Sequence, residues 1–427
     1  MTLTPRRRQM LWLFGAALMV RLLYVAAGID VAPQDTPDYD EIAHNVLAGE
    51  GFVAGNNWYG HELRAWRAPL YPLFLAAIYA TIGDSHTVVR SLQSLLGAMT
   101  VVFVYLMLQR LQPKAALPAG WFIALYEPLV ISVNEVMSEV LFTTLLVAGV
   151  AAAIEARHRP GWCWPALAGG LIGLAALTRP VGLLVVPAIL AVAAWEDLRG
   201  PGQWRRWSLF AGWVSVGLVA AMLPWTVRNA MVYGAFVPVS THGGFIVARS
   251  NADDPAWRQT HGWGIERQTF DEIPDELERD RRWMDQGLGW IADHPGAWLR
   301  LVGERFLRFW YVFRPDYNAA FVAMVPFLMA GLWYRGREPD FRHLSAVIIL
   351  SITVFSTILY GSTRFRLPLE PFFLVFAAVA AVEGWRRYGQ RFAVVSGLWL
   401  AGNGLLRLFD ESARGIVVGL LRAGGLK

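Results

Sequence analysis

The sequence predicts an all-helical protein that crosses a membrane many times. Of its 427 residues, 55% are hydrophobic and only 17% are charged, which is more apolar than a soluble domain of this length. Apolar runs long enough to span a bilayer recur along the chain, and short arginine clusters separate them. The formal net charge of +5 is therefore assigned to loops on the cytoplasmic side of a membrane. Nucleic acid is not expected as a partner.

The first apolar run, 11–28, follows Arg6, Arg7 and Arg8 and has the length of a membrane span. Because many further spans follow it, we interpret it as an uncleaved signal anchor. The later runs bring the predicted total to about eleven spans, give or take one. They lie at 86–111, 115–133, 136–155, 164–178, 180–196, 208–226, 319–334, 344–361, 371–385 and 392–408.

The basic clusters fall on alternate loops, as the positive-inside rule requires. They are Arg6 to Arg8, Arg110 with Lys114, Arg157 with Arg159, Arg199 with Arg205 and Arg206, Arg335 with Arg337 and Arg342, and Arg386 with Arg387 and Arg391. The opposite face then carries two long segments. The chain is predicted to consist of an N-terminal membrane module (1–226) with a first external loop (30–85), an external segment (227–318) and C-terminal membrane helices (319–427).

The external segments contain helical patterns of their own. Residues 38–47 place Ile42, Ala43, Val46 and Leu47 opposite Asp40, Glu41 and His44, which predicts an amphipathic interfacial helix. The apolar run 70–82 is too short to span and is entered by prolines, so we predict a second interfacial or re-entrant helix. Residues 297–311 are predicted to form a surface helix, and 271–285 a solvated helix face.

Acidic residues are concentrated in the first external loop of a chain that otherwise avoids charge. They are Asp30, Asp35, Asp38, Asp40, Glu41, Glu50 and Glu62, and they are accompanied by Arg64 and Arg67. Chemistry is therefore expected in this loop. His44 is a secondary site candidate, but no His-x-x-x-His or Cys-x-x-Cys spacing accompanies it, and Cys163 is the single cysteine. No metal and no other cofactor is predicted.

A series of short motifs resembles one enzyme group. It consists of an Asp-x-x-x-Tyr-x-x-Ile-Ala run ending in Gly-x-Gly-Phe (Asp35 to Phe52), Pro-x-Tyr-Pro (69–72), Asn-Glu-x-x-x-Glu (134–139), Thr-Arg-Pro (178–180), Pro-Trp-x-x-Arg-Asn (224–229), Gly-Gly (243–244) and Arg-Phe-Arg-Leu-Pro (364–368). In order and sidedness these motifs resemble bacterial GT-C-fold glycosyltransferases of the group that includes protein O-mannosyltransferases and lipid A aminoarabinose transferases. The resemblance covers about residues 10–385.

The resemblance implies a GT-C fold in a bacterial cytoplasmic (inner) membrane, with the active site facing the periplasm or exterior. It also implies transfer of a sugar from a polyprenyl-phosphate-linked donor to an acceptor, usually with inversion and without a metal. The acceptor is left open among a lipid, a polysaccharide, a cell-wall polymer and a protein. Membrane lipids are expected as further partners.

This chemistry needs a carboxylate to accept a proton and positive charge to stabilise a leaving phosphate. Asp35 is the candidate base because it lies just beyond the first span and matches the acid that begins the family's first-loop motif. Glu139 is a carboxylate about one turn inside the fourth predicted span, with a possible role as a second acid or in positioning the acceptor, and Glu135 lies one turn earlier. The alternative for Glu139 is an ion pair with Arg90 or Arg179. Asp38 is a secondary candidate whose alternative role is a helix N-cap.

Arg364 and Arg366 are candidates for donor-phosphate binding, because an extended backbone would point both side chains in one direction. Arg67 and Arg228 are further phosphate-binding candidates, and Arg179 is an alternative. Two other function classes remain open: a flippase, polymerase or ligase for polyprenyl-linked glycans, and a secondary transporter. A transporter is expected to show repeated halves and broken mid-membrane helices, and the sequence indicates neither.

Overall fold

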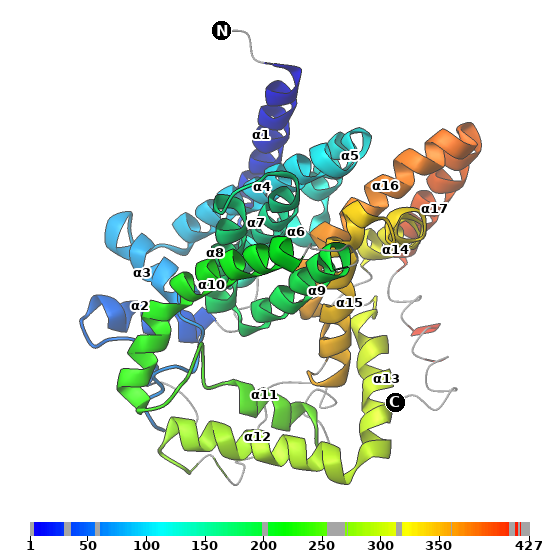
Figure 1. The fold of residues 1–427 in the computed structure, drawn as a ribbon. Coiled ribbons are helices and arrows are strands. Elements are labelled where there is room, and N and C mark those ends of the chain that lie inside the picture. Colours follow the sequence, from blue (N-terminus) through cyan, green and yellow to red (C-terminus); the bar gives the residue numbers. More distant parts are fainter. Residues whose placement is uncertain are drawn as a thin grey trace.

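Helices form at the apolar runs of the sequence in the computed structural model, which is drawn in Figure 1. The structure describes residues 4–29, 36–55, 60–198, 204–253, 270, 272–312, 318–359, 361–409, 415–416 and 419. Asp35 lies outside the described residues. Within them, β-structure is limited to one antiparallel bridge between Ala54 and Leu63. The predicted all-α class is therefore confirmed.

Seven helical segments among the described residues are long and apolar enough to cross a membrane. They are α1 (Pro5–Ala26), α4 (His86–Leu111), α7 (Glu139–His158), α9 (Val185–Asp197) with η2 (Pro180–Leu184), α10 (Trp204–Tyr233), α15 (Arg342–Thr357) with η4 (Pro339–Phe341), and α16 (Glu370–Tyr388) with η5 (Thr363–Phe365) and η6 (Leu367–Leu369). Three apolar helices are shorter: α3 (Leu70–Thr81), α8 (Cys163–Thr178) and α14 (Ala319–Arg335). The chain is a multi-pass membrane protein, and the total of eleven spans stays a prediction.

The run predicted as one span at 115–133 is broken. It forms α5 (Pro113–Leu125), then α6 (Glu127–Ile131) with η1 (Ser132–Asn134), and the two parts meet at an angle of 56°. The break occurs where Tyr126 is extended and Pro128 follows, because a proline excludes the preceding residues from a continuous helix. The carbonyls at the end of α5 are thereby left without helical partners.

Arg21, in the middle of α1, occupies this break. Its guanidinium donates to the carbonyl oxygens of Ala124 at 3.2 Å and Ile123 at 3.3 Å. The side chain is 1% exposed, and no described carboxylate forms an ion pair with it. The cation therefore caps the C-terminal end of α5, where the helix dipole favours positive charge.

Small residues set how closely the helices approach. A Cβ on Gly169 would collide with the Val214 carbonyl oxygen, and one on Gly217 would collide with the Ala166 carbonyl oxygen. These glycines let α8 and α10 cross with their backbones in contact, as small residues commonly do between membrane helices. In the same way, Gly331 of α14 lies against the backbone of Phe376 in α16.

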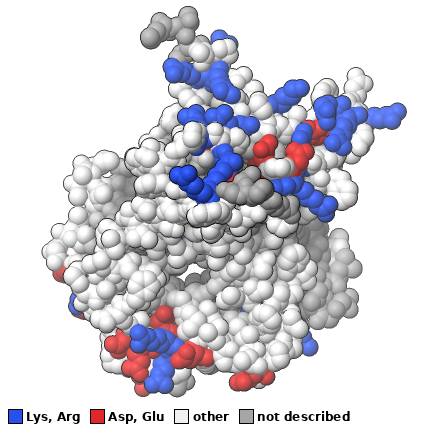
Figure 2. Space-filling view, viewed as in Figure 1, with Lys and Arg blue, Asp and Glu red and all other residues white. Residues whose placement is uncertain are grey.

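A separate layer of helices lies at the end of the bundle away from the N-terminus (Figure 1). It contains α11 (Gly243–Ser250), α12 (Glu276–Asp293) and α13 (Pro295–Phe309), and α2 (Thr36–Leu47) lies nearby. On the face seen in Figure 2, basic side chains predominate at the N-terminal end, a belt without charged side chains follows, and acidic side chains gather, with some basic ones, at the α12 end. This distribution agrees with the predicted alternation of arginine-rich and acidic faces.

The acidic-basic stretch 271–285 was predicted to be a solvated helix face, and this is wrong for one side of α12. Glu276, Arg279 and Trp283 are buried. The Glu276 carboxylate accepts hydrogen bonds from the backbone N–H groups of Arg64 and Ala65, at 2.6 and 3.2 Å, and from the hydroxyl groups of Tyr233 and Thr241. One buried carboxylate therefore joins the first external loop, the end of α10 and the second external segment.

Candidate functional site

Glu139 is the centre of the candidate site. It is the first residue of α7 and is 1% exposed, so it lies at the start of the helix and not one turn inside it. Its Oε1 atom forms ion pairs with Arg179 Nη1 at 2.6 Å and with Arg364 Nε. Its other carboxylate oxygen, Oε2, is buried and accepts no hydrogen bond from any described residue.

Three distant segments supply these groups. Arg179 follows α8, Glu139 begins α7, and Arg364 lies in the 3-10 helix η5. Two guanidinium groups therefore flank one carboxylate, and the Arg364 side chain is 25% exposed. Arginine forks bind phosphate through paired hydrogen bonds, so these guanidinium groups are chemically suited to a phosphate.

Glu135 lies on the segment that leads into α7, and its place differs from the prediction. It is extended and precedes α7, so the predicted i, i+4 relation with Glu139 on one helix is wrong. Burial raises the pKa of Glu135 from 4.5 to about 7, and the nearby Glu139 charge adds to this, whereas Arg364 opposes it. A carboxyl group with a pKa near neutrality can hold or release a proton at physiological pH.

The backbone of residues 133–137 is held by a polar side chain of α4. Gln93 is fully buried, and its amide donates to the carbonyl oxygens of Val133 at 2.9 Å and Glu135 at 2.8 Å. The Tyr71 hydroxyl of α3 in turn donates to Gln93 Oε1 at 2.8 Å. These hydrogen bonds hold the backbone from which the Glu135 and Glu139 side chains project.

The first external loop reaches the same segment. The Thr36 hydroxyl, at the start of α2, donates to the Val136 carbonyl oxygen at 3.0 Å. The Tyr39 hydroxyl lies 3.4 Å from Ser138 Oγ. The beginning of α2 is therefore adjacent to the residues that precede Glu139. Asp35 comes directly before Thr36 in the sequence, and it lies outside the described residues.

Arg366 occupies a different position from Arg364. An extended backbone was expected to aim both side chains in one direction, and this is wrong because residues 363–365 form a 3-10 helix. Arg366 is 3% exposed. Its guanidinium pairs with Glu370 at 2.8 Å, donates to the Phe309 carbonyl oxygen at 3.0 Å and lies over the Phe321 ring. These contacts commit the Arg366 guanidinium to protein partners between helices.

Two other arginine candidates also have protein partners. Arg67 forms an ion pair with Asp38, with Nη2 2.5 Å and Nε 2.9 Å from Oδ2. Arg228 donates to the Arg64 carbonyl oxygen at 2.7 Å and lies over the Trp225 ring. The structure thus gives both arginines a role in holding the first external loop.

Asp38 lies in the first turn of α2, which begins at Thr36, so the predicted N-cap role of Asp38 is wrong. His44 Nε2 donates a hydrogen bond to the Asp84 carboxylate at 2.8 Å, and this bond raises the pKa of His44 above its ordinary value. Neither residue is brought to Glu139.

Among the described residues, no group of three or more histidine, cysteine or acidic side chains is arranged to hold a metal. Independence from metal stays a prediction.

The importance of Arg179 was not evident from the sequence. The sequence indicated it only as an alternative phosphate ligand or ion-pair partner, whereas in the structure it is one of the two cations that pair with Glu139. The Thr-Arg-Pro motif at 178–180 was its only signal. Tyr71 belongs to the Pro-x-Tyr-Pro motif at 69–72, but nothing in the sequence indicated Gln93, because its role is to support the backbone of another segment.

Comparison with known proteins agrees with this architecture. The sequence profile of the family described as dolichyl-phosphate-mannose-protein mannosyltransferase matches residues 66–225, a region that includes Glu135, Glu139 and Arg179. The oligosaccharyltransferase of Archaeoglobus fulgidus, solved with zinc and sulfate, superposes with a TM-score of 0.61 at 15% identity, covering 92% of this chain and 51% of that one. The chain has a GT-C fold. The predicted resemblance to GT-C glycosyltransferases is thereby confirmed.

Two further GT-C structures superpose over most of the chain. ArnT from Cupriavidus metallidurans, bound to undecaprenyl phosphate, gives a TM-score of 0.56 at 15% identity and covers 93% of this chain and 72% of that one. AglB from Archaeoglobus fulgidus, in complex with an inhibitory peptide and a dolichol-phosphate, gives 0.56 at 13% identity, covering 92% and 54%. The chain spans about half the length of the archaeal enzymes. Curated protein sequences give no significant match.

Proposed function

We propose that the chain is a glycosyltransferase that moves a sugar from a polyprenyl-phosphate-linked donor to an acceptor, with inversion at the anomeric carbon. The observation that carries this proposal is the ion-paired cluster of Glu139, Arg179 and Arg364, in which two guanidinium groups from distant segments meet at one carboxylate and Arg364 is partly exposed. Two relatives with the same fold are bound to undecaprenyl phosphate and to a dolichol-phosphate. The setting is the cytoplasmic membrane of a bacterium, with the cluster on the periplasmic or exterior face.

The proposed reaction follows from the charges. An acceptor hydroxyl attacks the anomeric carbon, a carboxylate takes its proton, and the bond to the phosphate oxygen breaks. The polyprenyl phosphate then carries the additional negative charge, which Arg364 and Arg179 stabilise. Glu139 is a positioning residue that holds both guanidinium groups, and its free Oε2 atom is available to an acceptor or sugar hydroxyl.

Asp35 is the proposed general base. Support comes from its sequence neighbour Thr36, which bonds to Val136 three residues before Glu139. Glu135 is the alternative base, because its pKa of about 7 suits proton transfer. The acceptor is a lipid, polysaccharide, cell-wall polymer or protein, and the proposal does not depend on which.

Replacement of Asp35 tests the base. Glycolipids and glycoproteins of cells lacking the chain are compared by mass spectrometry with those of cells expressing wild type, Asp35→Asn or Glu50→Gln. Wild type and Glu50→Gln, an exposed acid in the same loop, are expected to restore the missing glycan, and Asp35→Asn is not. Restoration by Asp35→Asn contradicts its role as base, and an unchanged glycan profile in deleted cells contradicts the transferase.

Replacement of Arg364 tests the donor site. Arg364→Gln removes a charge-assisted contact to phosphate, so the affinity of the purified protein for undecaprenyl phosphate is expected to fall by about tenfold or more. Arg300→Gln, an exposed arginine of α13, is the matched control and should bind as wild type does. Equal affinity of Arg364→Gln and wild type in a direct binding titration would place the phosphate elsewhere.

A further inference from the structure

A second cluster of arginines lines a cavity at the opposite end of α7. The cavity has a volume of about 400 Å³ and lies where α7, α9, α10 and α15 meet on the arginine-rich face. Arg157, Arg206 and Arg342 contribute to its wall, together with Trp195 and His343. At 1.5 Å per residue, Arg157 is about 27 Å along α7 from Glu139. The cavity is therefore distinct from the candidate active site.

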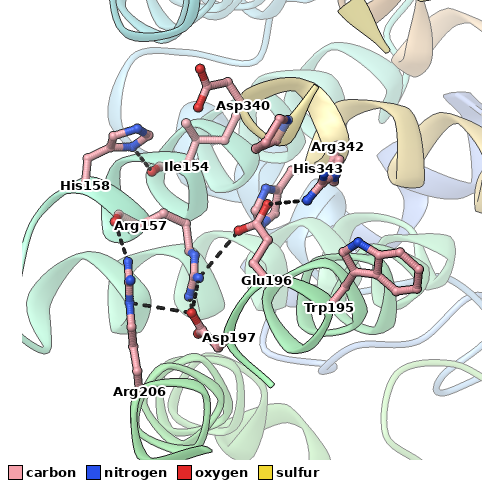
Figure 3. A pocket seen from close by; sticks show the side chains of 11 residues that line it. Ile154, Arg157, His158, Trp195, Glu196, Asp197, Arg206, Asp340, Arg342 and His343 are labelled. Atoms are coloured by element: carbon pink, nitrogen blue, oxygen red, sulfur yellow. Dashed lines mark hydrogen bonds and ion pairs between the residues drawn. The ribbon is translucent and has the colours of Figure 1, made fainter. Parts of the chain in front are cut away.

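The acidic residues of the cavity neutralise one arginine more fully than the other two. Arg157 donates two hydrogen bonds, of 2.8 and 2.6 Å, to the Asp197 carboxylate. Arg206 Nε lies 3.7 Å from Asp197, and Arg342 Nη1 lies 3.9 Å from Glu196. Figure 3 shows these arginines converging on Glu196 and Asp197, while Asp340 stands apart. Arg206 Nη2 also donates to the Arg157 carbonyl oxygen at 3.0 Å, and the remaining N–H groups of Arg206 and Arg342 keep donor capacity for a further anion.

A buried histidine adds an independent observation. His343, which lines the cavity, is 3% exposed. Its Nε2 atom has no hydrogen-bond partner among the described residues. A buried polar atom without a partner is costly, and in a cavity this size it indicates a missing ligand or ordered water. The imidazole can donate to, or accept from, a group placed beside the two loosely paired arginines.

We propose that this cavity binds a phosphate group. Arginine forks bind phosphate through paired hydrogen bonds, and basic pockets between membrane helices on the cytoplasmic side bind lipid headgroups. Trp195 is 54% exposed at the rim, where tryptophan commonly lies at the membrane interface. The cavity is larger than a phosphate ion, so it accommodates the phosphate together with the group that carries it. The source is an anionic phospholipid headgroup or a soluble phosphate.

Binding by the full-length protein distinguishes the two sources. In the first arm, wild type in nanodiscs with phosphatidylglycerol is analysed by native mass spectrometry for retained lipid. In the second, wild type in phosphatidylcholine nanodiscs is titrated with inorganic phosphate, and thermal stabilisation is measured. We expect one arm to show binding, and Arg206→Gln combined with Arg342→Gln to weaken it by about tenfold or more.

Arg205→Gln is the matched control, because Arg205 is exposed beside Arg206 on α10 and does not line the cavity. If the double variant fails to fold, Arg342→Gln alone replaces it, since the ion pair of Arg342 within the described part of the chain is the long contact to Glu196. Retained lipid that the variant loses identifies a headgroup site, and stabilisation by inorganic phosphate that the variant loses identifies a soluble ligand. No binding in either arm, or equal binding by variant and wild type, overturns the proposal. These readouts do not depend on sugar transfer.

Discussion

At the residue scale, the candidate site contains two carboxyl groups whose surroundings differ. Glu139 is held between two guanidinium groups, and such pairing favours the ionised form of a carboxyl group. Glu135 is partly buried beside Glu139, and its pKa is raised to about 7. Carboxyl groups whose environments separate their proton affinities are a common arrangement in enzymes that combine charge stabilisation with proton transfer. The two acids of the candidate site therefore lie in different electrostatic environments.

The raised pKa of Glu135 makes stability depend on pH. The unfolded chain ionises this group near its ordinary value of 4.5, whereas the folded chain keeps it protonated to about 7. Unfolding in this interval releases a proton, so the free energy of unfolding is expected to fall as pH rises from about 4.5 to about 7. Glu135→Gln should remove this part of the pH dependence in thermal unfolding, and Glu50→Gln should not. A slope in Glu135→Gln identical to that of wild type would refute the assignment.

At the scale of single elements, the break between α5 and α6 determines the position of the segment 132–138, which leads into the candidate site. The broken helix needs partners for its terminal carbonyls, and Arg21 of α1 supplies them. Gly97 of α4 makes room, because a Cβ there would come within 2.6 Å of Arg21 Nε. A charge inside a membrane helix is costly, and its position at the end of another helix offsets that cost.

Replacing Arg21 with methionine keeps the apolar stem and removes the donors. Two buried carbonyl groups then lose their partners, so Arg21→Met is expected to lower the free energy of unfolding by about 1–3 kcal/mol. Thermal or denaturant unfolding in detergent measures this, with Arg8→Gln, an exposed arginine of the same helix, as the control. Equal stability of Arg21→Met and wild type would show that the cap contributes nothing.

At the scale of the whole molecule, the external layer depends on contacts between segments far apart in sequence. Glu276 accepts hydrogen bonds from the first external loop, from the end of α10 and from Thr241. Around it, Phe52, Trp66, Phe245 and Trp283 form one apolar cluster. The first loop, which also reaches the site through Thr36, is thus positioned by the second external segment.

Removing this carboxylate is expected to release the first loop without unfolding the membrane helices. In Glu276→Ala, hydrogen–deuterium exchange should increase in residues 52–68, because the N–H groups of Arg64 and Ala65 lose their acceptor. Exchange in α4 and α7 should stay unchanged. Glu278→Ala is the control, since Glu278 lies on the same helix and is exposed. Equal exchange in the two variants would exclude Glu276 as the connection.

The sequence by itself determined the class and the position of most helices, and it predicts the sidedness. Apolar runs such as 86–111, which forms α4 with the same bounds, follow from the cost of placing polar groups in hydrocarbon, and this cost is local to each segment. The arginine clusters set the alternation of faces for the same reason. Motif order pointed to Glu139 and Arg364, and the fold class followed from the resemblance.

Only the tertiary structure decided which charged residues meet. Arg364 and Arg366 are two positions apart, yet one pairs with Glu139 and the other with Glu370, because a 3-10 turn separates their directions. Arg179 joins the site through the packing of α8 against α7, and Arg67 and Arg228 are committed to loop contacts. Charge pairing acts over a few ångströms between segments that lie far apart in the chain. Sequence spacing carries no record of such distances, so the membership of the site is a property of the packed helices.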